Sequence, residues 1–172
     1  TQLGGRLVKI DCRREETFVN NRVRHAIRTH IISWVRPDGT FAARKIECFS
    51  NQGAYASHGH AVAAKGMGAF PQLYPCENVE GDAWTVFTNR PAAGAMRGYG
   101  IPQAMWASEC HMDDVAKALG QDPVEYRRQV VMPKGYVDGF SKNENYYDTF
   151  RQVMDKGMEA IGYAEKRKRY EN

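Results

Sequence analysis

Residues 25–49 read HAIRTHIISWVRPDGTFAARKIECF, and they set the fold that we expect. The segment 25–35 is rich in β-branched and aromatic residues, which favour a β-strand. The PDGT sequence at 37–40 is typical of a turn, because proline fixes one backbone angle and glycine adopts a positive φ without strain. The segment 41–49 then resumes a strand pattern. The stretch therefore predicts a long antiparallel hairpin.

Segments on both sides of the hairpin add two strand candidates and a helix. Residues 6–12 alternate apolar and polar side chains, as a half-buried strand does. Residues 83–88, AWTVFT, are the second strand candidate. Residues 50–70 are rich in Gly, Ala and His, and we expect a loop there, followed by a short helix over roughly residues 58–68.

The sequence beyond this point predicts helices. Residues 103–119 have apolar side chains at helical spacing, and Gly120 follows as a C-cap. Asp122 and Pro123 then supply the N-cap and first-turn chemistry of a second helix, which we expect to reach about Val130.

A polar loop is expected over 133–145, a third helix over 146–161, and a frayed polar tail over 163–172. The chain shows no internal repeat and no linker, so residues 1–172 are interpreted as a single domain. The predicted fold class is α+β, with an antiparallel-rich sheet followed by helices.

The composition is that of a soluble globular protein. The 172 residues are 42% hydrophobic and 26% charged, which is enough for one domain with its own core. No window approaches the ~20 apolar residues of a membrane span, and the first residues lack the pattern of a secretory signal. We expect a cytoplasmic location and no membrane partner. Because Thr1 is not Met, we also expect a segment of a longer protein or a cleaved precursor.

The charge pattern does not favour nucleic-acid binding. The formal net charge is +4, but basic residues are scattered among acidic ones, and the one dense basic run, KRKR at 166–169, fits a solvated helix face. A basic RNA-binding module remains only an alternative. Zinc or iron–sulfur ligation is not expected, because no CxxC pair occurs among Cys12, Cys48, Cys76 and Cys110.

The glycine-rich segment after the second strand candidate is the candidate ligand-binding segment of the sequence. Residues 88–103 read TNRPAAGAMRGYGIPQ. Its glycines let the backbone approach a ligand and aim N–H groups at an anion. Arg97 adds a cationic fork, Tyr99 adds a flat face for stacking, and the following helix adds its N-terminal partial charge. On the residues alone, a tight strand-to-helix turn with a surface arginine is an equal alternative.

Other conspicuous residues have simpler interpretations. His58 and His60 could be two metal ligands, but no third ligand is evident, so a helix cap or surface histidines are favoured. Trp34, Trp84 and Trp106 are expected in the core or at a subunit interface.

The run 88–103 resembles the signature of the molybdenum hydroxylases, which include xanthine dehydrogenase, aldehyde oxidoreductase (aldehyde oxidase), nicotinate dehydrogenase and 4-hydroxybenzoyl-CoA reductase. The shared order is Thr-Asn, a loop, Arg-Gly-aromatic-Gly and Pro-Gln. Further matches follow in the family's order: RLVK at 6–9, REETF at 14–18, GAY at 53–55, then Glu109, Met112, Asp113, Ala116, Leu119-Gly120, Asp122-Pro123 and Arg127. The resemblance, which spans about residues 5–165, implies part of the molybdopterin-binding domain of a large subunit.

The resemblance implies a cofactor-binding role for the loop. In the family, the arginine of Arg-Gly-aromatic-Gly lies beside the molybdenum, and its backbone, rather than its side chain, helps to hold the metal centre. That catalytic residue corresponds to Arg97. Ala95, Met96 and Gly98 would be cofactor-binding residues with it.

The resemblance also implies residues that line the substrate slot. Tyr99 would stack on planar substrates, and Gly100 would give the backbone room beside it. A substrate-orienting arginine of xanthine-oxidising relatives corresponds to Lys65, as a second catalytic residue, when residues are counted back from Tyr74 without a gap. Lysine replaces a bidentate arginine poorly, which argues mildly against xanthine as the substrate.

The implied activity is hydroxylation of an aromatic heterocycle, aldehyde or aryl-CoA with water as the oxygen source, or the reductive dehydroxylation. The implied cofactor is molybdenum–molybdopterin, in its plain or dinucleotide form. The implied partners are the rest of the large subunit, an iron–sulfur subunit and an FAD subunit. The family's glutamate base and its Gly-Phe-rich cofactor loop do not occur in these residues, so we expect a segment that is inactive alone. A non-catalytic subunit-docking fragment of the same architecture is the alternative.

Overall fold

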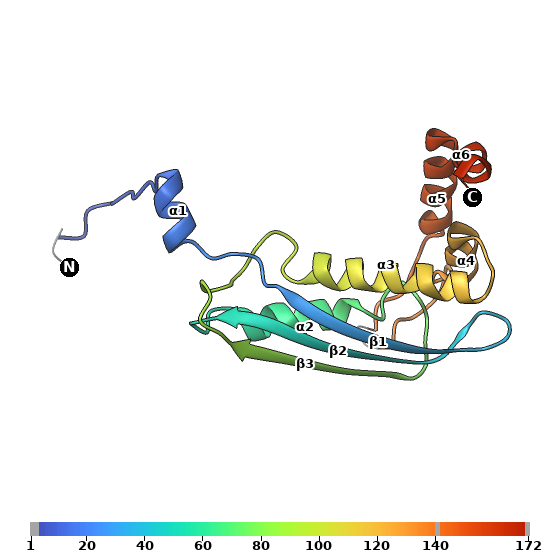
Figure 1. Ribbon diagram of the computed structural model, residues 1–172, viewed down its shortest axis with the longest axis horizontal. Helices are drawn as coiled ribbons and strands as arrows, with labels where there is room; N and C mark the ends of the chain where they lie inside the picture. The colour runs from blue at the N-terminus through green and yellow to red at the C-terminus, as the bar shows by residue number, and fades with distance from the viewer. Residues whose placement is uncertain (1–3, 140–141, 171–172) are drawn as a thin grey trace.

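The structure is a computed structural model that describes residues 4–139 and 142–170. A small sheet lies against two helices, and an extended N-terminal arm and a C-terminal group of helices project from opposite ends of this body (Figure 1). In chain order the elements are α1 (Arg14–Asn20), β1 (Ile27–Val35), β2 (Phe41–Gly53), α2 (Gly59–Ala69), β3 (Val79–Phe87), α3 (Ile101–Ala118), α4 (Pro123–Val130), α5 (Thr149–Ile161) and α6 (Tyr163–Tyr170).

The predicted hairpin is confirmed. β1 and β2 pair antiparallel, with Ile27 opposite Ser50 and Trp34 opposite Ala43. In the turn between them, Gly39 has a φ of +85°, and its N–H donates a 2.9 Å hydrogen bond to the carbonyl oxygen of Arg36. The turn therefore uses its glycine in the left-handed region, where other residues are strained.

β3 joins the other edge of β2 in parallel, which gives the strand order β1-β2-β3 over the described residues. Parallel neighbours need a crossover connection, and α2 supplies it. The α+β class is confirmed, and the sheet combines one antiparallel pair with one parallel pair.

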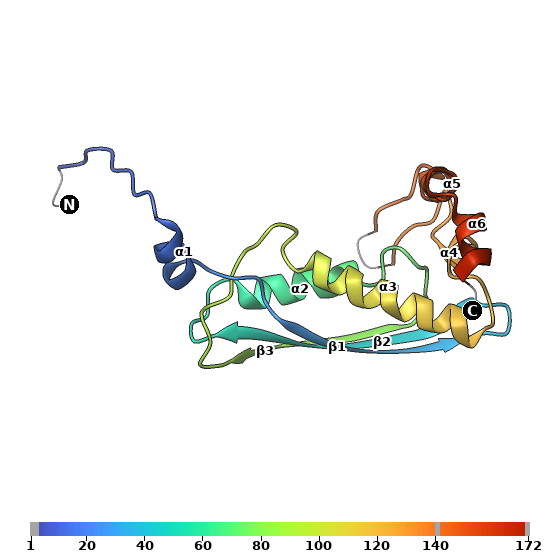
Figure 2. The same ribbon diagram turned by 45° about the horizontal axis from the view of Figure 1, so that its top comes forward.

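α2 and α3 cover the same face of the sheet, and its other face is open (Figure 2). Buried side chains gather in two clusters on the covered face. The larger cluster consists of Phe41, Tyr74, Met112, Val115, Ala116, Tyr126, Val130 and Val131. The smaller consists of Ile46, Cys48 and Phe70. The helices are thus fixed to the sheet by apolar burial, which dominates the stability of such packing.

The predicted helix boundaries from α3 to α4 are confirmed. Gly120 has a φ of +67° just after α3, and the N–H of Gln121 donates to the carbonyl of Ala116 at 2.9 Å, as in a Schellman motif. The carboxylate of Asp122 accepts hydrogen bonds from the N–H groups of Val124 and Glu125, which caps α4.

Two predictions from the sequence are wrong. Residues 6–12 form an exposed, unpaired segment instead of a strand, because no strand among the described residues lies beside them to pair with their backbone. The tail is helical over 163–170 instead of frayed. The hydroxyl of Tyr163 donates to the carboxylate of Asp122 at 2.8 Å, and this contact holds α6 beside α4.

Some predicted ranges extend beyond the described residues. Residues 171–172 of the tail, 140–141 of the polar loop and 1–3 of the proposed domain lie outside them. The described parts of the 133–145 loop contain no helix or named strand, and the third helix begins at Thr149.

Candidate functional site

The glycine loop, which we define as residues 94–100, connects β3 to α3 and is anchored at its start. The N–H of Ala93 donates to the carbonyl of Gln52 at 2.9 Å, and the side-chain amide of Gln52 donates back to the carbonyl of Ala93 at 3.3 Å. The N–H of Gly94 donates to the carbonyl of Val23 at 3.1 Å. The loop therefore starts from a fixed point between β2 and the segment before β1.

The middle of the glycine loop is a tight turn that requires glycine. The N–H of Tyr99 donates to the carbonyl of Met96 at 2.7 Å, and φ is +87° at Gly98, +48° at Tyr99 and +93° at Gly100. A Cβ atom on Gly100 would lie 2.2 Å from the carbonyl oxygen of Val62 in α2. The loop can thus approach α2 closely only because this residue has no side chain.

The outer part of the glycine loop exposes main-chain donors. The N–H groups of Ala95, Met96, Arg97 and Gly98 donate no hydrogen bond to any described residue, and all four residues are exposed. Within residues 4–139 and 142–170, the Arg97 side chain likewise forms no hydrogen bond or ion pair. Successive free N–H groups beside a guanidinium are chemistry suited to an anion.

Arg24 ties this turn to the rest of the protein. Its Nη2 donates to the carbonyl oxygen of Arg97 at 2.6 Å, and its Nη1 lies 3.3 Å from Oε1 of Gln103 in α3. The amide of Gln103 in turn donates to the carbonyl of His25 at 3.0 Å. The His25 side chain is buried, and this burial lowers the pKa of its imidazole below the ordinary value.

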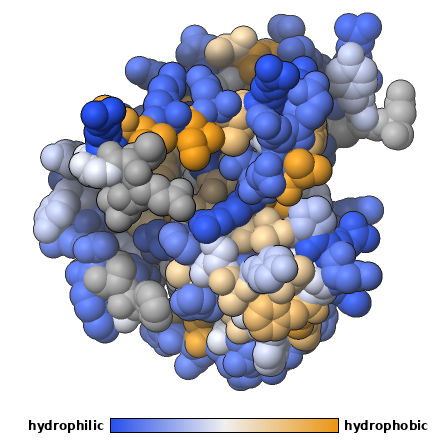
Figure 3. All heavy atoms as spheres, turned by 90° about the vertical axis from the view of Figure 1, so that its left-hand side faces the viewer, coloured by the Kyte–Doolittle hydropathy of each residue, from blue (hydrophilic) through white to orange (hydrophobic). Residues whose placement is uncertain are grey.

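The electrostatic setting of the glycine loop is positive. α2 and α3 both begin at the end of the sheet where β2 and β3 end, and the loop lies at this end (Figure 1). Helix N-termini carry partial positive charge. Arg22 packs its stem over Gly94, where a Cβ would meet Cδ of Arg22 at 2.3 Å. In the described part of the chain, neither this arginine nor Arg24 or Arg97 forms an ion pair. Figure 3 views this end, where apolar side chains lie among mostly hydrophilic ones.

Tyr99 contacts a residue that the sequence did not connect to it. Its hydroxyl lies 3.1 Å from Nδ1 of His58, and the two rings meet edge to face. His58 occupies the N-cap position of α2 without a capping hydrogen bond from its side chain. The sequence favoured a cap or a surface histidine, and it offered no signal for this tertiary contact.

Lys65 lies on α2 and is exposed. No described residue forms a hydrogen bond or ion pair with its side chain, so its predicted role toward substrate remains a prediction. The structure thus brings Ala95, Met96, Arg97, Gly98, Tyr99 and Gly100 together on one loop. Arg24 and His58 are additions that became visible only in three dimensions.

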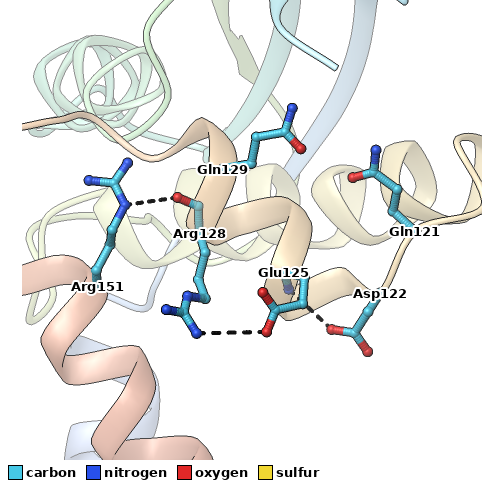
Figure 4. A pocket seen from close by; sticks show the side chains of 6 residues that line it. All are labelled: Gln121, Asp122, Glu125, Arg128, Gln129 and Arg151. Atoms are coloured by element: carbon cyan, nitrogen blue, oxygen red, sulfur yellow. Dashed lines mark hydrogen bonds and ion pairs between the residues drawn. The ribbon is translucent and has the colours of Figure 1, made fainter. Parts of the chain in front are cut away.

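Two hollows of the described surface differ in their position relative to the glycine loop: one lies beside it and the other lies away from it. One of about 410 Å³ lies between β1 and α3, with Arg24, Gln103 and Trp106 on its wall. Another lies between α4 and α5, where Arg128 and Arg151 are paired with acidic side chains or main-chain oxygens (Figure 4).

Among the described residues, no three His, Cys, Asp or Glu side chains gather in a way that could hold a metal ion. None of the described helices is long and apolar enough to cross a membrane.

Comparisons with known proteins agree with the resemblance. The profile of the molybdopterin cofactor-binding domain matches residues 1–131. The xanthine dehydrogenase molybdenum-binding subunit of Escherichia coli O157:H7 is 37% identical over 172 residues, which are 100% of this chain and 23% of that protein. The nicotinate dehydrogenase large molybdopterin subunit of Eubacterium barkeri is 34% identical over 164 residues, with coverage of 93% and 39%.

A solved structure supports the same relationship. The aldehyde oxidoreductase of Desulfovibrio gigas superposes with a TM-score of 0.76 at 29% identity, over 86% of this chain and 16% of that one. The chain therefore spans less than a quarter of the length of the xanthine dehydrogenase subunit and of this structure.

Proposed function

Because the chain belongs to the molybdopterin cofactor-binding domain family of the xanthine dehydrogenase and aldehyde oxidoreductase type, we propose that it forms one part of the active site of a molybdenum hydroxylase. The proposed substrate is an aromatic heterocycle, an aldehyde or an aryl-CoA. The rest of the large subunit completes the site, and iron–sulfur and FAD modules accept the electrons.

The observation that carries this proposal is the row of free N–H groups from Ala95 to Gly98. An anionic cofactor needs donors that are already oriented and not occupied by the protein's own acceptors. The close approach of Gly100 to Val62 holds the loop in the shape that leaves these donors free.

The loop fits a molybdenum–pterin group by the chemistry of its donors. Its residues offer main-chain N–H groups and the guanidinium of Arg97, and none of them is acidic. When bound, the group supplies the two-electron redox chemistry of hydroxylation, with water as the oxygen source. The chain's own share is to hold the group through Ala95, Met96, Arg97 and Gly98 and to stabilise negative charge beside it.

Tyr99 lines the substrate slot in this proposal, and Gly100 gives the backbone the room it needs beside that residue. The Tyr99 ring offers a planar surface on which an aromatic substrate stacks, and its contact with His58 limits the orientations of that ring. Lys65 on α2 orients a polar substituent of the substrate. Its ammonium carries three N–H donors on one nitrogen, which cannot reproduce the planar bidentate hydrogen bonds of the arginine in xanthine-oxidising relatives.

Exposed apolar surface supports the need for further parts of the subunit. Leu7 and Ile10 of the N-terminal arm are 102% and 84% exposed, and every residue of β3 is exposed. On the open face of the sheet, Trp84 stacks on Phe49 with ring centroids 4.8 Å apart, and Trp84 remains 42% exposed. Apolar surface and an unpaired strand edge of this kind are usually covered in a complete protein.

The test is the metal and pterin content of the complete native protein. We expect about one molybdenum and one pterin for each large subunit by elemental analysis and mass spectrometry. The 172-residue chain alone should bind neither and should be inactive. If the complete protein is prepared from cells that make the cofactor and contains neither molybdenum nor pterin, the proposal is refuted. A salt-dependent affinity for RNA would instead favour the nucleic-acid alternative.

A further inference from the structure

The turn in the glycine loop contains one peptide group that the turn itself does not fix. Residues 96–99 are closed by the hydrogen bond from the N–H of Tyr99 to the carbonyl of Met96. The central peptide joins Arg97 to Gly98 and takes no part in that bond. The φ of Gly98, +87°, is that of the third residue of a type II turn. Type I and type II turns differ mainly in the direction of this central peptide, so glycine leaves both directions accessible.

Arg24 fixes the direction of this peptide. Its Nη2 holds the carbonyl oxygen of Arg97 at 2.6 Å, a charge-assisted hydrogen bond across 73 residues of sequence. A planar trans peptide directs its C=O and N–H to opposite sides. Because the carbonyl of Arg97 is directed to Arg24, the N–H of Gly98 is directed away from Arg24, where it meets no described acceptor.

Gln103 supports this arrangement from α3. Its Oε1 lies 3.3 Å from Nη1 of Arg24, and its amide donates to the main chain at His25. The guanidinium is therefore fixed at two points, one on the loop and one on the helix that follows. Within the described structure no carboxylate pairs with Arg24, so its charge acts on the carbonyl without competition from an ion-pair partner.

We propose that Arg24 is a positioning residue, which orients the Arg97–Gly98 peptide so that the Gly98 N–H is available as a donor to an anionic acceptor of the cofactor. This inference rests on the proposed function. It assigns a role to a residue outside the loop, in the segment before β1. Loss of Arg24 frees the peptide to turn over, and this would present a carbonyl oxygen where an N–H donor is needed.

The experiment compares Arg24→Gln with Arg28→Gln in the complete, cofactor-loaded enzyme. Arg28 is an exposed arginine of β1 whose side chain makes no hydrogen bond to a described residue, so it controls for the loss of one positive charge. We expect kcat per bound molybdenum to fall roughly 10-fold or more in Arg24→Gln and to stay unchanged in Arg28→Gln. Arg24→Lys, which keeps one cationic donor, should recover part of the loss.

Two further measurements separate positioning from simple stabilisation. Hydrogen exchange should show that cofactor loading protects the Gly98 amide in the wild type and protects it less in Arg24→Gln. The electron paramagnetic resonance signal of Mo(V), compared per molybdenum, should change in the same variant. If Arg24→Gln only lowers the yield of loaded enzyme, with kcat per molybdenum, the Mo(V) signal and Gly98 protection as in the wild type, the proposal is wrong. Failure of the proposed function would look different, because the wild type itself would then contain no molybdenum.

Discussion

The hydroxyl group of Tyr99 lies 3.1 Å from Nδ1 of His58, which joins the glycine loop to the residue that precedes α2. Tyr99 has a φ of +48°, a conformation that is uncommon for a residue with a side chain. The hydrogen bond and the ring contact help to offset the strain of that backbone. The ring that we assign to the substrate slot is thus held from α2 as well as from the loop.

The first prediction concerns this ring. Tyr99→Leu should raise KM for aromatic substrates about 5-fold, because it removes the stacking surface, for which about 1 kcal/mol is typical. Tyr99→Phe keeps the ring and loses only the bond to His58, so its KM should change much less. Steady-state kinetics of the complete enzyme measure both. Equal KM values in Tyr99→Leu and the wild type would show that the ring does not line the slot.

The second prediction concerns the close approach of the loop to α2. Gly100→Ala should prevent cofactor loading, because its Cβ would lie 2.2 Å from the carbonyl oxygen of Val62. Gly120→Ala is the matched control, since Gly120 also has a positive φ but no atom within 4 Å of the added Cβ. The control should lose only about 1 kcal/mol of unfolding free energy and load normally, as judged by molybdenum content. Normal loading of Gly100→Ala would contradict this account of the loop.

The third prediction concerns the junction of α3 and α4. The guanidinium of Arg127 donates to the carboxylates of Glu109 at 2.7 Å and Asp113 at 2.6 Å, and its side chain is only 16% exposed. Arg127→Leu should cost about 2 kcal/mol of unfolding free energy, because it removes these two ion pairs together with the hydrogen bonds from the guanidinium to the carbonyl oxygens of Glu109 and Pro123. Arg128→Leu removes two ion pairs of a more exposed arginine, with Glu125 and Asp155, and should cost less than about 1 kcal/mol. If Arg127→Leu and Arg128→Leu have equal urea midpoints of unfolding, the stabilising role assigned to Arg127 is contradicted.

The fourth prediction concerns pH. Burial lowers the pKa of both His25 and His111 below the ordinary value of 6.5. As the pH falls from above 6.5 toward the lowered pKa of the folded state, the unfolded chain binds more protons at these positions than the folded chain does, so stability falls as the pH decreases through that window. The urea midpoint should therefore be lower at pH 5.5 than at pH 7.5. The difference should shrink in a His25→Gln, His111→Gln double variant. A difference of the same size in both proteins would assign the pH dependence to other groups.

Local sequence patterns predicted those helices, strands and turns that are determined by residues close together in the sequence. The hairpin was predictable from its strand residues and the turn glycine at Gly39, and the start of α4 from the capping chemistry of Asp122. The loop residues 95–100 were identifiable from the glycines around Arg97, together with the family resemblance. Their roles toward cofactor and substrate remain predictions.

Features that depend on distant residues were not predictable. The alternation in residues 6–12 fits an extended segment equally well with or without a partner strand, so the pattern could not decide between them. α6 is held by Tyr163 on Asp122, a contact that no local propensity encodes. The same applies to Arg24, since nothing in its sequence neighbourhood indicates a bond to the carbonyl of Arg97.

The measurement that tests the central claim most directly is the position of molybdenum in the complete subunit, located by anomalous X-ray diffraction. We predict that the molybdenum peak lies beside the main chain of Ala95–Gly98, with N–H groups of these residues donating to the cofactor. Arg97→Ala should keep this fold and lose turnover, because the guanidinium that stabilises negative charge is gone. A molybdenum peak elsewhere in the subunit, with residues 94–100 facing solvent, would contradict the account.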